Sequence, residues 1–289
     1  MKFAGAYTAL VTPFSADGRV DYGRLRALVG EQIAAGVAGL VPVGTSGESP
    51  TLTHAEHVEV IRAVVEAVGG RVQVVAGAGS NSTAEALELT RGAIEAGADA
   101  TLQVAPYYNR PTQPMLVAHF SALADLGKPV VLYNIPGRTG VEIAIPTVAE
   151  LSKHPMIQCV KEAGGNVDRV SKTLDVCDIA VLSGDDSLTL PMMAVGASGV
   201  ISVVTHVAPK AVVEMVRAAA EGRFGDALAI HRKYYPLFTG LFLETNPVPV
   251  KAALELTGHG PAVYRAPLGR MSDGNLAKLR EIMQKLDLL

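Results

Sequence analysis

Eight apolar runs of strand length alternate with amphipathic helical stretches, and this pattern predicts a (β/α)8 TIM barrel with a C-terminal helical extension. The runs are too apolar for strands with one solvated face, so they indicate parallel strands covered on both sides. An alternating series of this length forms a closed barrel more naturally than an open doubly wound sheet. The strands are expected at residues 5–13, 38–44, 72–79, 100–106, 129–136, 156–163, 179–184 and 198–204.

The stretches between these runs carry apolar residues at helical spacing, with charges on the opposite face. Examples are residues 22–36, 54–68 and 83–97. After residue 204 the strand pattern stops and the chain reads as helical, with breaks at 246–250, 258–260 and 266–267. We therefore predict one compact unit, with the barrel at 1–222 and the helical extension at 223–289.

Composition indicates a large globular core. Hydrophobic residues make up 49% of the 289 residues and charged residues 18%, which argues against disorder. A net charge of −3 without a basic stripe argues against a nucleic-acid partner. Two cysteines are too few for a disulfide framework, and no apolar run approaches the roughly 20 residues that cross a bilayer. The N-terminus reads as a first strand and not as a signal peptide, so we expect a cytoplasmic protein without membrane contact.

Residues 156–166, MIQCVKEAGGN, read as a buried strand that ends at a pair of glycines. Side chains alternate along a strand, so Cys159, Lys161 and Ala163 share one face. If that face points into the barrel, Lys161 stands at its mouth among apolar neighbours. Burial there disfavours the ammonium form and favours a nucleophilic amine. The alternative is a lysine that extends into solvent from a strand end.

In a TIM barrel the chemistry lies at the carboxyl ends of the strands. The loop Gly44–Ser49 follows the second strand and offers backbone N–H groups and hydroxyls to a small carboxylate. It is equally well read as an ordinary turn whose hydroxyls cap a helix. It lacks the Gly-Lys-[Ser/Thr] ending of a phosphate-binding loop, and Gly77-Ala78-Gly79 lacks the third glycine of a dinucleotide fingerprint.

Polar residues also follow the fourth and fifth strands. Tyr133 is expected at the same barrel mouth as Lys161, where a phenol beside an amine forms an acid/base pair. Arg138 suits bidentate capture of a carboxylate or is a solvated loop residue. Tyr107 and Tyr108 either pack or move protons.

Two further groups have simpler interpretations. His54 and His57 lie three residues apart without an HExxH pattern or an evident third ligand, so we expect no metal. Asp185 and Asp186 follow the seventh strand and read as a helix N-cap and a first-turn acid.

Seven motifs occur in an order and spacing that resemble the class I pyruvate-dependent aldolase/lyase family over essentially the whole chain: GTSGES, YYNRPTQ, YNIPGRTG, CVKEAGGN, LSGDD, GVISV and NPVPVK. Within that family the chain is similar to the dihydrodipicolinate synthases, because the sialic acid lyases and sugar-acid aldolases usually lack an arginine equivalent to Arg138. The resemblance implies condensation of pyruvate with L-aspartate 4-semialdehyde in the diaminopimelate/lysine pathway. It also implies no cofactor and a homotetramer built as a dimer of dimers.

The same resemblance assigns roles to single residues. Lys161 matches the Schiff-base lysine, and Tyr133 matches the tyrosine that moves protons to and from the adduct. Thr45 matches the hydroxyl that links Tyr133 to Tyr108, which reaches into the neighbouring subunit's site. Arg138 matches the residue that holds the carboxylate of the semialdehyde.

The substrate pocket is completed, by resemblance, by Ser46 at the pyruvate carboxylate and by Gly184 and Ile201 in the wall. Two departures from the family pattern are visible. Ser46 stands where threonine is commoner, and Gly164 replaces the usual serine or threonine.

Five residues resemble the allosteric lysine site of feedback-sensitive members of the family: His54, His57, Asn81, Glu85 and Tyr107. Glu85 suits an ammonium, while Asn81 and Tyr107 suit a carboxylate, so L-lysine is a candidate effector. Two other functions stay open, a retro-aldolase for a keto-sugar acid and a barrel without catalysis. Arg138 argues against the first, and the complete set of matched residues argues against the second.

Overall fold

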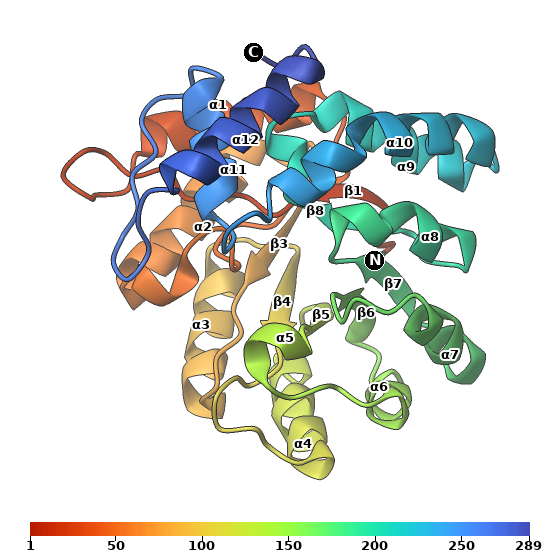
Figure 1. Ribbon diagram of the computed structural model, residues 1–289. Helices are drawn as coiled ribbons and strands as arrows, with labels where there is room; N and C mark the ends of the chain where they lie inside the picture. Colours follow the sequence, from red (N-terminus) through yellow and green to blue (C-terminus); the bar gives the residue numbers. More distant parts are fainter.

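In the computed structural model, which describes residues 1–289, eight parallel strands close into a barrel in chain order (Figure 1). Strand β8 pairs with β1 in parallel and completes the ring. This architecture confirms the predicted barrel. The strands are β1 Gly5–Thr8, β2 Gly39–Leu40, β3 Gln73–Gly77, β4 Ala100–Val104, β5 Val130–Asn134, β6 Ile157–Glu162, β7 Ala180–Ser183 and β8 Gly199–Ser202.

The strands end earlier than the apolar runs predict. In the second run the ladder covers only Gly39–Leu40, and Val43 adopts a left-handed φ of 49°. A left-handed residue cannot continue an extended strand, so the apolar residues that follow the ladder belong to the loop. The rim of the barrel after β2 is therefore formed by buried loop backbone. Helix α2 and then β3 follow this loop in the sequence.

Helices cover the outside of the barrel and its mouth. They are α1 Tyr22–Ala34, α2 His54–Val68, α3 Thr83–Glu95, α4 Gln113–Ala124, α5 Pro136–Thr139, α6 Ile145–Leu151, α7 Asp168–Val176, α8 Thr189–Ala194, α9 Pro209–Ala220, α10 Phe224–Gly240, α11 Val248–Leu256 and α12 Asp273–Lys285. Three single turns of 3-10 helix are η1 Ser49–Thr51, η2 Asp186–Leu188 and η3 Val204–His206. None of the helices combines the length and the apolar character that a bilayer crossing requires.

The predicted break at 246–250 is only partly correct. Helix α11 begins at Val248 and has a proline in its first turn. Proline is tolerated there because the first N–H groups of a helix have no partner within the helix. The break is thus confined to the residues before Val248, and this short segment lies next to the barrel mouth.

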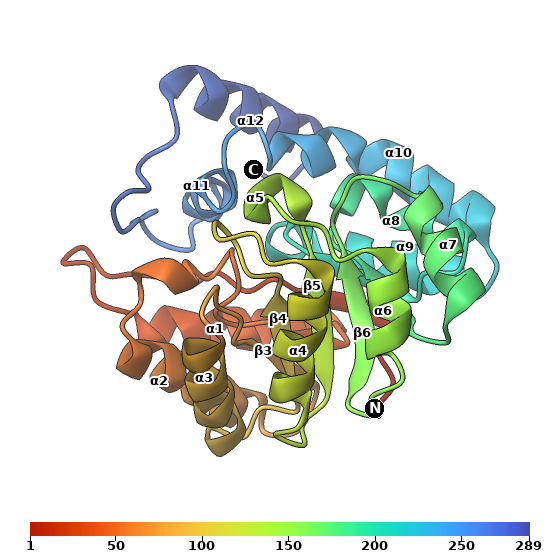
Figure 2. The same ribbon diagram turned by 90° about the horizontal axis from the view of Figure 1, so that it is seen from below.

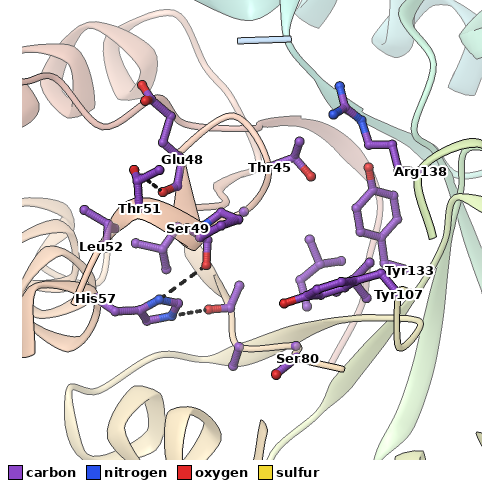
Figure 3. Close-up of a pocket in the computed structure, with 18 of the residues that line it drawn as sticks. Thr45, Glu48, Ser49, Thr51, Leu52, His57, Ser80, Tyr107, Tyr133 and Arg138 are labelled. Atoms are coloured by element: carbon purple, nitrogen blue, oxygen red, sulfur yellow. Dashed lines mark hydrogen bonds between the residues drawn. The ribbon is translucent and has the colours of Figure 1, made fainter. Parts of the chain in front are cut away.

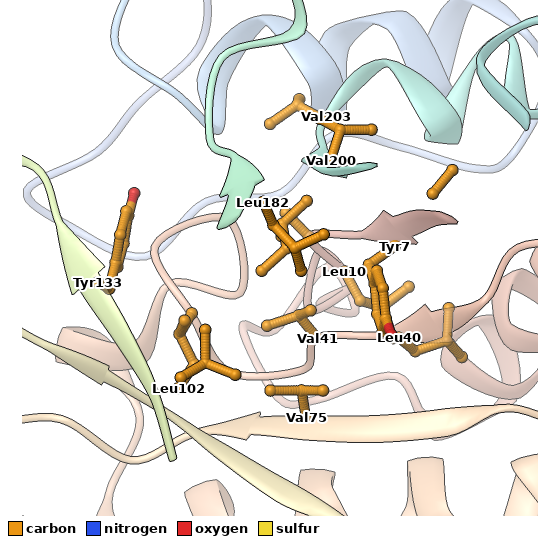
Figure 4. Close-up of a cluster of buried hydrophobic side chains, with 14 of the residues drawn as sticks. Tyr7, Leu10, Leu40, Val41, Val75, Leu102, Tyr133, Leu182, Val200 and Val203 are labelled. Atoms are coloured by element: carbon orange, nitrogen blue, oxygen red, sulfur yellow. The ribbon is translucent and has the colours of Figure 1, made fainter. Parts of the chain in front are cut away.

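The register of β5 on β6 sorts four side chains onto two faces. Tyr133 lies opposite Lys161, and Asn134 lies opposite Glu162. Figure 4 shows Tyr133 among buried apolar side chains that include Leu102 and Leu182. Lys161 therefore stands in an apolar setting, as the alternation of the strand predicts.

The opposite face of this strand pair holds a buried polar network around Glu162. Its carboxylate accepts hydrogen bonds from Asn134 Nδ2 at 2.9 and 3.1 Å and from Arg169 Nε at 3.1 Å. Arg169 also donates to the carbonyl of Ile143 at 2.9 Å, and the Ile143 N–H donates to Asn134 Oδ1 at 3.0 Å. Every strong donor and acceptor in the ring has a partner, so the buried charge of Glu162 is compensated.

The C-terminal helices lie at the end of the barrel where α5 follows β5 (Figure 2). A buried ion pair joins them to the loop after β2, because Lys251 Nζ on α11 contacts the carboxylate of Glu48. The two side chains are 5% and 0% exposed. Arg265 adds a backbone N–H to the same carboxylate at 3.2 Å. Burial lowers the pKa of Lys251 to about 8 despite the adjacent Glu48.

Candidate active site

A cavity of about 480 Å³ opens at the carboxyl ends of the strands, between the barrel and the C-terminal extension. Its wall combines the loops after β2, β3, β4 and β5 with the segments 245–247 and 267–268. Figure 3 shows Thr45, Tyr133 and Arg138 around one end of this cavity and His57 and Ser80 around the other. Residues far apart in the sequence thus line one cavity.

Lys161 is buried and does not line the cavity itself, but it contacts Tyr133, which does. The residue is 6% exposed, which excludes a lysine that extends into solvent. Its Nζ lies 4.1 Å from the centre of the Tyr133 ring, and no carboxylate forms an ion pair with it. An amine without a counter-ion beside a phenol is suited to nucleophilic attack and proton exchange.

Gly184, at the end of β7, leaves room for the Lys161 side chain. A Cβ atom at position 184 would lie 3.0 Å from Lys161 Cε and 2.6 Å from Ala163 Cβ. The next residue, Asp185, is buried, and burial raises the pKa of its carboxyl while the nearby Lys161 charge opposes that shift.

The two acids after β7 occupy the predicted positions, with Asp185 at the N-cap and Asp186 in the first turn of η2, but neither carboxylate caps that turn. Asp186 instead accepts hydrogen bonds from the N–H groups of Val203 at 3.0 Å and Val204 at 3.3 Å. Burial raises the pKa of Asp186 to about 6. The Ser202 hydroxyl also donates to this carboxylate, so Asp186 bonds the end of β8 and not the 3-10 turn in which it lies.

The loop Gly44–Ser49 presents unpaired backbone N–H groups that suit an anion, and we call it the anion cradle. A Cβ at Gly47 would lie 2.8 Å from Val43 Cα, so only glycine allows this tight turn. The backbone N–H groups of Thr45 and Ser46 make no hydrogen bond within the chain. Ser46 is 3% exposed, and its Oγ accepts a hydrogen bond from Asn246 Nδ2 at 2.9 Å. Unpaired N–H groups beside hydroxyls favour a carboxylate.

Arg138 lies on α5, directly after the Tyr133 strand. Its Nη2 donates to the carbonyl oxygen of Asn246 at 3.3 Å. A guanidinium has five N–H donors, so most of them are left for a ligand in the cavity. The geometry therefore places one cation and one anion cradle at the same end of the space.

Not every predicted residue reaches the cavity. Tyr108 is 90% exposed, has a left-handed φ of 72°, and does not line the cavity of its own chain. Lys161, Ser46, Gly184 and Ile201 are likewise not among the residues that line the cavity. No hydrogen bond joins Thr45 to Tyr133, although both line the space.

Four of the five candidate effector residues, His54, His57, Glu85 and Tyr107, line the same cavity, and Figure 3 shows Tyr107 next to Tyr133 and His57 on the other side. His54 Nε2 lies 2.9 Å from Glu85 Oε1, and this contact raises the pKa of His54. His57 Nε2 lies 2.8 Å from the carbonyl oxygen of Gly77, and burial lowers the pKa of His57. Asn81 lies outside the lining.

Sequence reasoning missed Asn246. The residue lies in the NPVPVK motif, which indicates the family resemblance and a helix break but assigns no role at the site. Its contacts to Ser46 and Arg138 span 200 and 108 residues of sequence, which no local pattern predicts.

Comparison with known proteins decides the family. The family model described as "Dihydrodipicolinate synthetase family" matches residues 2–286. The chain belongs to this family. It is 48% identical to the 4-hydroxy-tetrahydrodipicolinate synthase of Haloarcula marismortui, over 99% of this chain and 95% of that one. The crystal structure of dihydrodipicolinate synthase from Aquifex aeolicus matches with a TM-score of 0.97 and 47% identity, over 99% of both chains.

Two solved members of the family carry ligands. The chloride-inhibited enzyme from Acinetobacter baumannii is complexed with pyruvate and matches with a TM-score of 0.98 and 39% identity, over 100% of both chains. The enzyme from Cyanidioschyzon merolae has lysine bound and matches with a TM-score of 0.96 and 41% identity, over 99% of both chains.

The space beside Gly184 gives a first test of the site. In Gly184→Ala the new Cβ displaces the Lys161 side chain, and a misplacement of about 1 Å lowers kcat/KM for pyruvate by roughly a hundredfold. The matched control is Gly225→Ala, because nothing lies within 4 Å of the Cβ position there. The measurement is kcat/KM for pyruvate in both variants by steady-state kinetics. Equal rates in the two variants would show that Lys161 does not need the space at position 184.

Proposed function

We propose that this chain condenses pyruvate with L-aspartate 4-semialdehyde to give 4-hydroxy-tetrahydrodipicolinate, through a Schiff base on Lys161. This lyase activity is that of the 4-hydroxy-tetrahydrodipicolinate synthases, to which the chain is similar over its full length, and it belongs to the lysine/diaminopimelate pathway. One observation carries the chemistry: a buried amine without a counter-ion lies 4.1 Å from the centre of a tyrosine ring.

The first half of the reaction activates pyruvate. The Lys161 amine attacks the ketone carbon, and the carbinolamine loses water to give an iminium. The iminium draws electrons from the methyl group, so a methyl proton leaves and an enamine forms. Tyr133 is the nearest phenol and moves protons in these steps. The N–H groups of Thr45 and Ser46 hold the pyruvate carboxylate.

The second half forms the ring. The enamine carbon adds to the aldehyde carbon of the second substrate, and the aldehyde oxygen takes up a proton. The amino group of the substrate then attacks the iminium carbon, closes the ring and releases the Lys161 amine. Arg138 pairs with the carboxylate of the semialdehyde and orients the aldehyde towards the enamine.

The role of Tyr108 depends on assembly. Its side chain is 90% exposed in one chain, beside the half-exposed Tyr107. An exposed aromatic pair favours burial against another subunit. We propose a homotetramer of two dimers in which Tyr108 enters the partner's site and extends the proton relay through Thr45.

The direct test is reduction of the enzyme–pyruvate complex with borohydride. We expect loss of activity and a single labelled residue, Lys161, because reduction makes the iminium a stable secondary amine. The variant Lys161→Arg should take up no label, whereas Lys172→Arg, at a 60% exposed surface lysine, should be labelled as the wild type is. Peptide mass mapping identifies the lysine that carries the reduced pyruvate adduct. A label on a different lysine refutes the proposed mechanism.

Removal of Arg138 tests the choice of acceptor. Loss of a charge-assisted pair costs about 1.5–3 kcal/mol, so Arg138→Ala should lower kcat/KM for aspartate semialdehyde roughly ten- to a hundredfold. Pyruvate trapping should stay close to that of the wild type. A parallel loss of trapping would show that Arg138 supports the whole site. Better use of an aldehyde without a carboxylate would favour the keto-sugar aldolase.

L-lysine is the proposed effector, and it enters the cavity. Glu85 pairs with the ammonium and Tyr107 binds the carboxylate, with His54 and His57 alongside. Asn81 lies outside the lining and reaches the carboxylate only if its side chain turns towards the cavity. Because Tyr107 adjoins Tyr108, a ligand that orders Tyr107 also shifts the proton relay. The lysine bound to the Cyanidioschyzon merolae enzyme supports this proposal.

We expect free L-lysine to inhibit the enzyme and Glu85→Ala to abolish the inhibition with most activity retained. Glu88→Ala is the control, since Glu88 is 68% exposed and contacts only the other nitrogen of His54, at 3.4 Å. Initial rates over a lysine series measure the effect. Flat rates up to several millimolar lysine in the wild type would remove the effector and leave the catalytic proposal intact.

A further inference from the structure

The C-terminal extension takes part in substrate binding through one residue. We propose that Asn246 is a positioning residue that orients the Ser46 hydroxyl as a donor to the pyruvate carboxylate. The inference deepens the proposed function and rests on it. All the candidate site residues named from the sequence lie within 1–222, whereas Asn246 lies in the extension.

Asn246 makes two contacts through separate parts of the residue. Its side-chain Nδ2 donates to Ser46 Oγ at 2.9 Å, and its backbone carbonyl accepts from Arg138 Nη2 at 3.3 Å. The residue is 7% exposed and lines the cavity. Asn246 therefore contacts both the anion cradle, through its side chain, and Arg138, through its backbone carbonyl.

The direction of the side-chain hydrogen bond decides what Ser46 can do. A serine hydroxyl has one proton and two lone pairs. When the Asn246 amide occupies a lone pair, the hydroxyl proton turns to another acceptor, and a carboxylate in the cradle is the strongest one. If Asn246 accepted the proton instead, Ser46 would offer that carboxylate only lone pairs, which repel it.

The remaining oxygen of the amide supports this role. Asn246 Oδ1 is buried and has no hydrogen-bond partner within the chain. An unpaired buried acceptor costs free energy that folding alone does not recover. The contact to Ser46 is therefore the one hydrogen bond that the Asn246 side chain makes within the chain.

The extension holds Asn246 firmly in place. The Lys251 N–H donates to the carbonyl of Pro247 at 3.1 Å, and the Lys251 side chain forms the buried ion pair with Glu48. Glu48 lies two residues after Ser46, in a left-handed conformation with φ 54°. The cradle is thus fixed from outside the barrel at two points, Ser46 and Glu48, and both partners come from a segment of six residues.

Pyruvate titration with borohydride trapping tests the inference. In Asn246→Ala the half-saturating pyruvate concentration should rise roughly three- to tenfold, as expected for one lost hydrogen bond. Asn246→Asp keeps size and shape but only accepts, and it adds a negative charge, so the rise should exceed about thirtyfold. Asn275→Ala, at a remote residue of the same extension, is the control.

A double-mutant cycle separates positioning from general damage. If Asn246 acts through Ser46, Ser46→Ala/Asn246→Ala binds pyruvate no more weakly than Ser46→Ala alone. The KM for aspartate semialdehyde should stay within about twofold in Asn246→Ala, because the backbone contact to Arg138 persists. At saturating pyruvate, the rate of borohydride trapping in Asn246→Ala should equal that of the wild type.

Three outcomes overturn the inference. Additive losses in the cycle would assign Asn246 a separate role, and wild-type affinity in Asn246→Asp would mean that Ser46 donates to position 246. A wild type without a pyruvate adduct would sink the proposed function and this inference together. If Asn246→Ala does not fold, Asn246→Asp carries the same test with an isosteric side chain.

Discussion

The register of β5 on β6 is the constraint on which the site depends. It sets Tyr133 opposite Lys161 on one face and Asn134 opposite Glu162 on the other. A slip of one residue would exchange the two faces and place Lys161 among the helices. The network of Glu162, Asn134 and Arg169 opposes such a slip, because it would leave buried charges without partners. Structural polar groups outside the barrel thereby fix the reactive pair inside it.

The same network explains a departure from the family pattern. Gly164 stands where serine or threonine is usual, and its N–H donates to Glu162 Oε1 at 2.8 Å. A Cβ atom at this position would lie 2.7 Å from that oxygen. Glycine is therefore the residue that suits this placement of the Glu162 carboxylate. A serine or threonine would require the carboxylate to move, and its hydroxyl would then supply a replacement partner.

The sequence predicted the features that follow from the spacing of apolar residues and from the residues at the ends of the strands. The barrel, the alternation that buries Lys161 and the loop of Thr45 and Ser46 all follow from patterns within a few residues. It did not predict the carboxylate of Asp186 at the end of β8 or the contacts of Asn246, because both join segments that only the closed barrel brings together. Nor did it predict that Tyr133 and Arg138 line the same cavity as the effector residues His54, His57 and Glu85, because these residues also come from separate segments.

A crystal structure of the enzyme mixed with pyruvate tests the central claim most directly. The account predicts a covalent bond between Lys161 Nζ and the ketone carbon of pyruvate. It also predicts that the carboxylate of the adduct lies within hydrogen-bond distance of the Thr45 and Ser46 N–H groups. Pyruvate held without a bond to Lys161, or with its carboxylate turned away from this loop, would contradict the account.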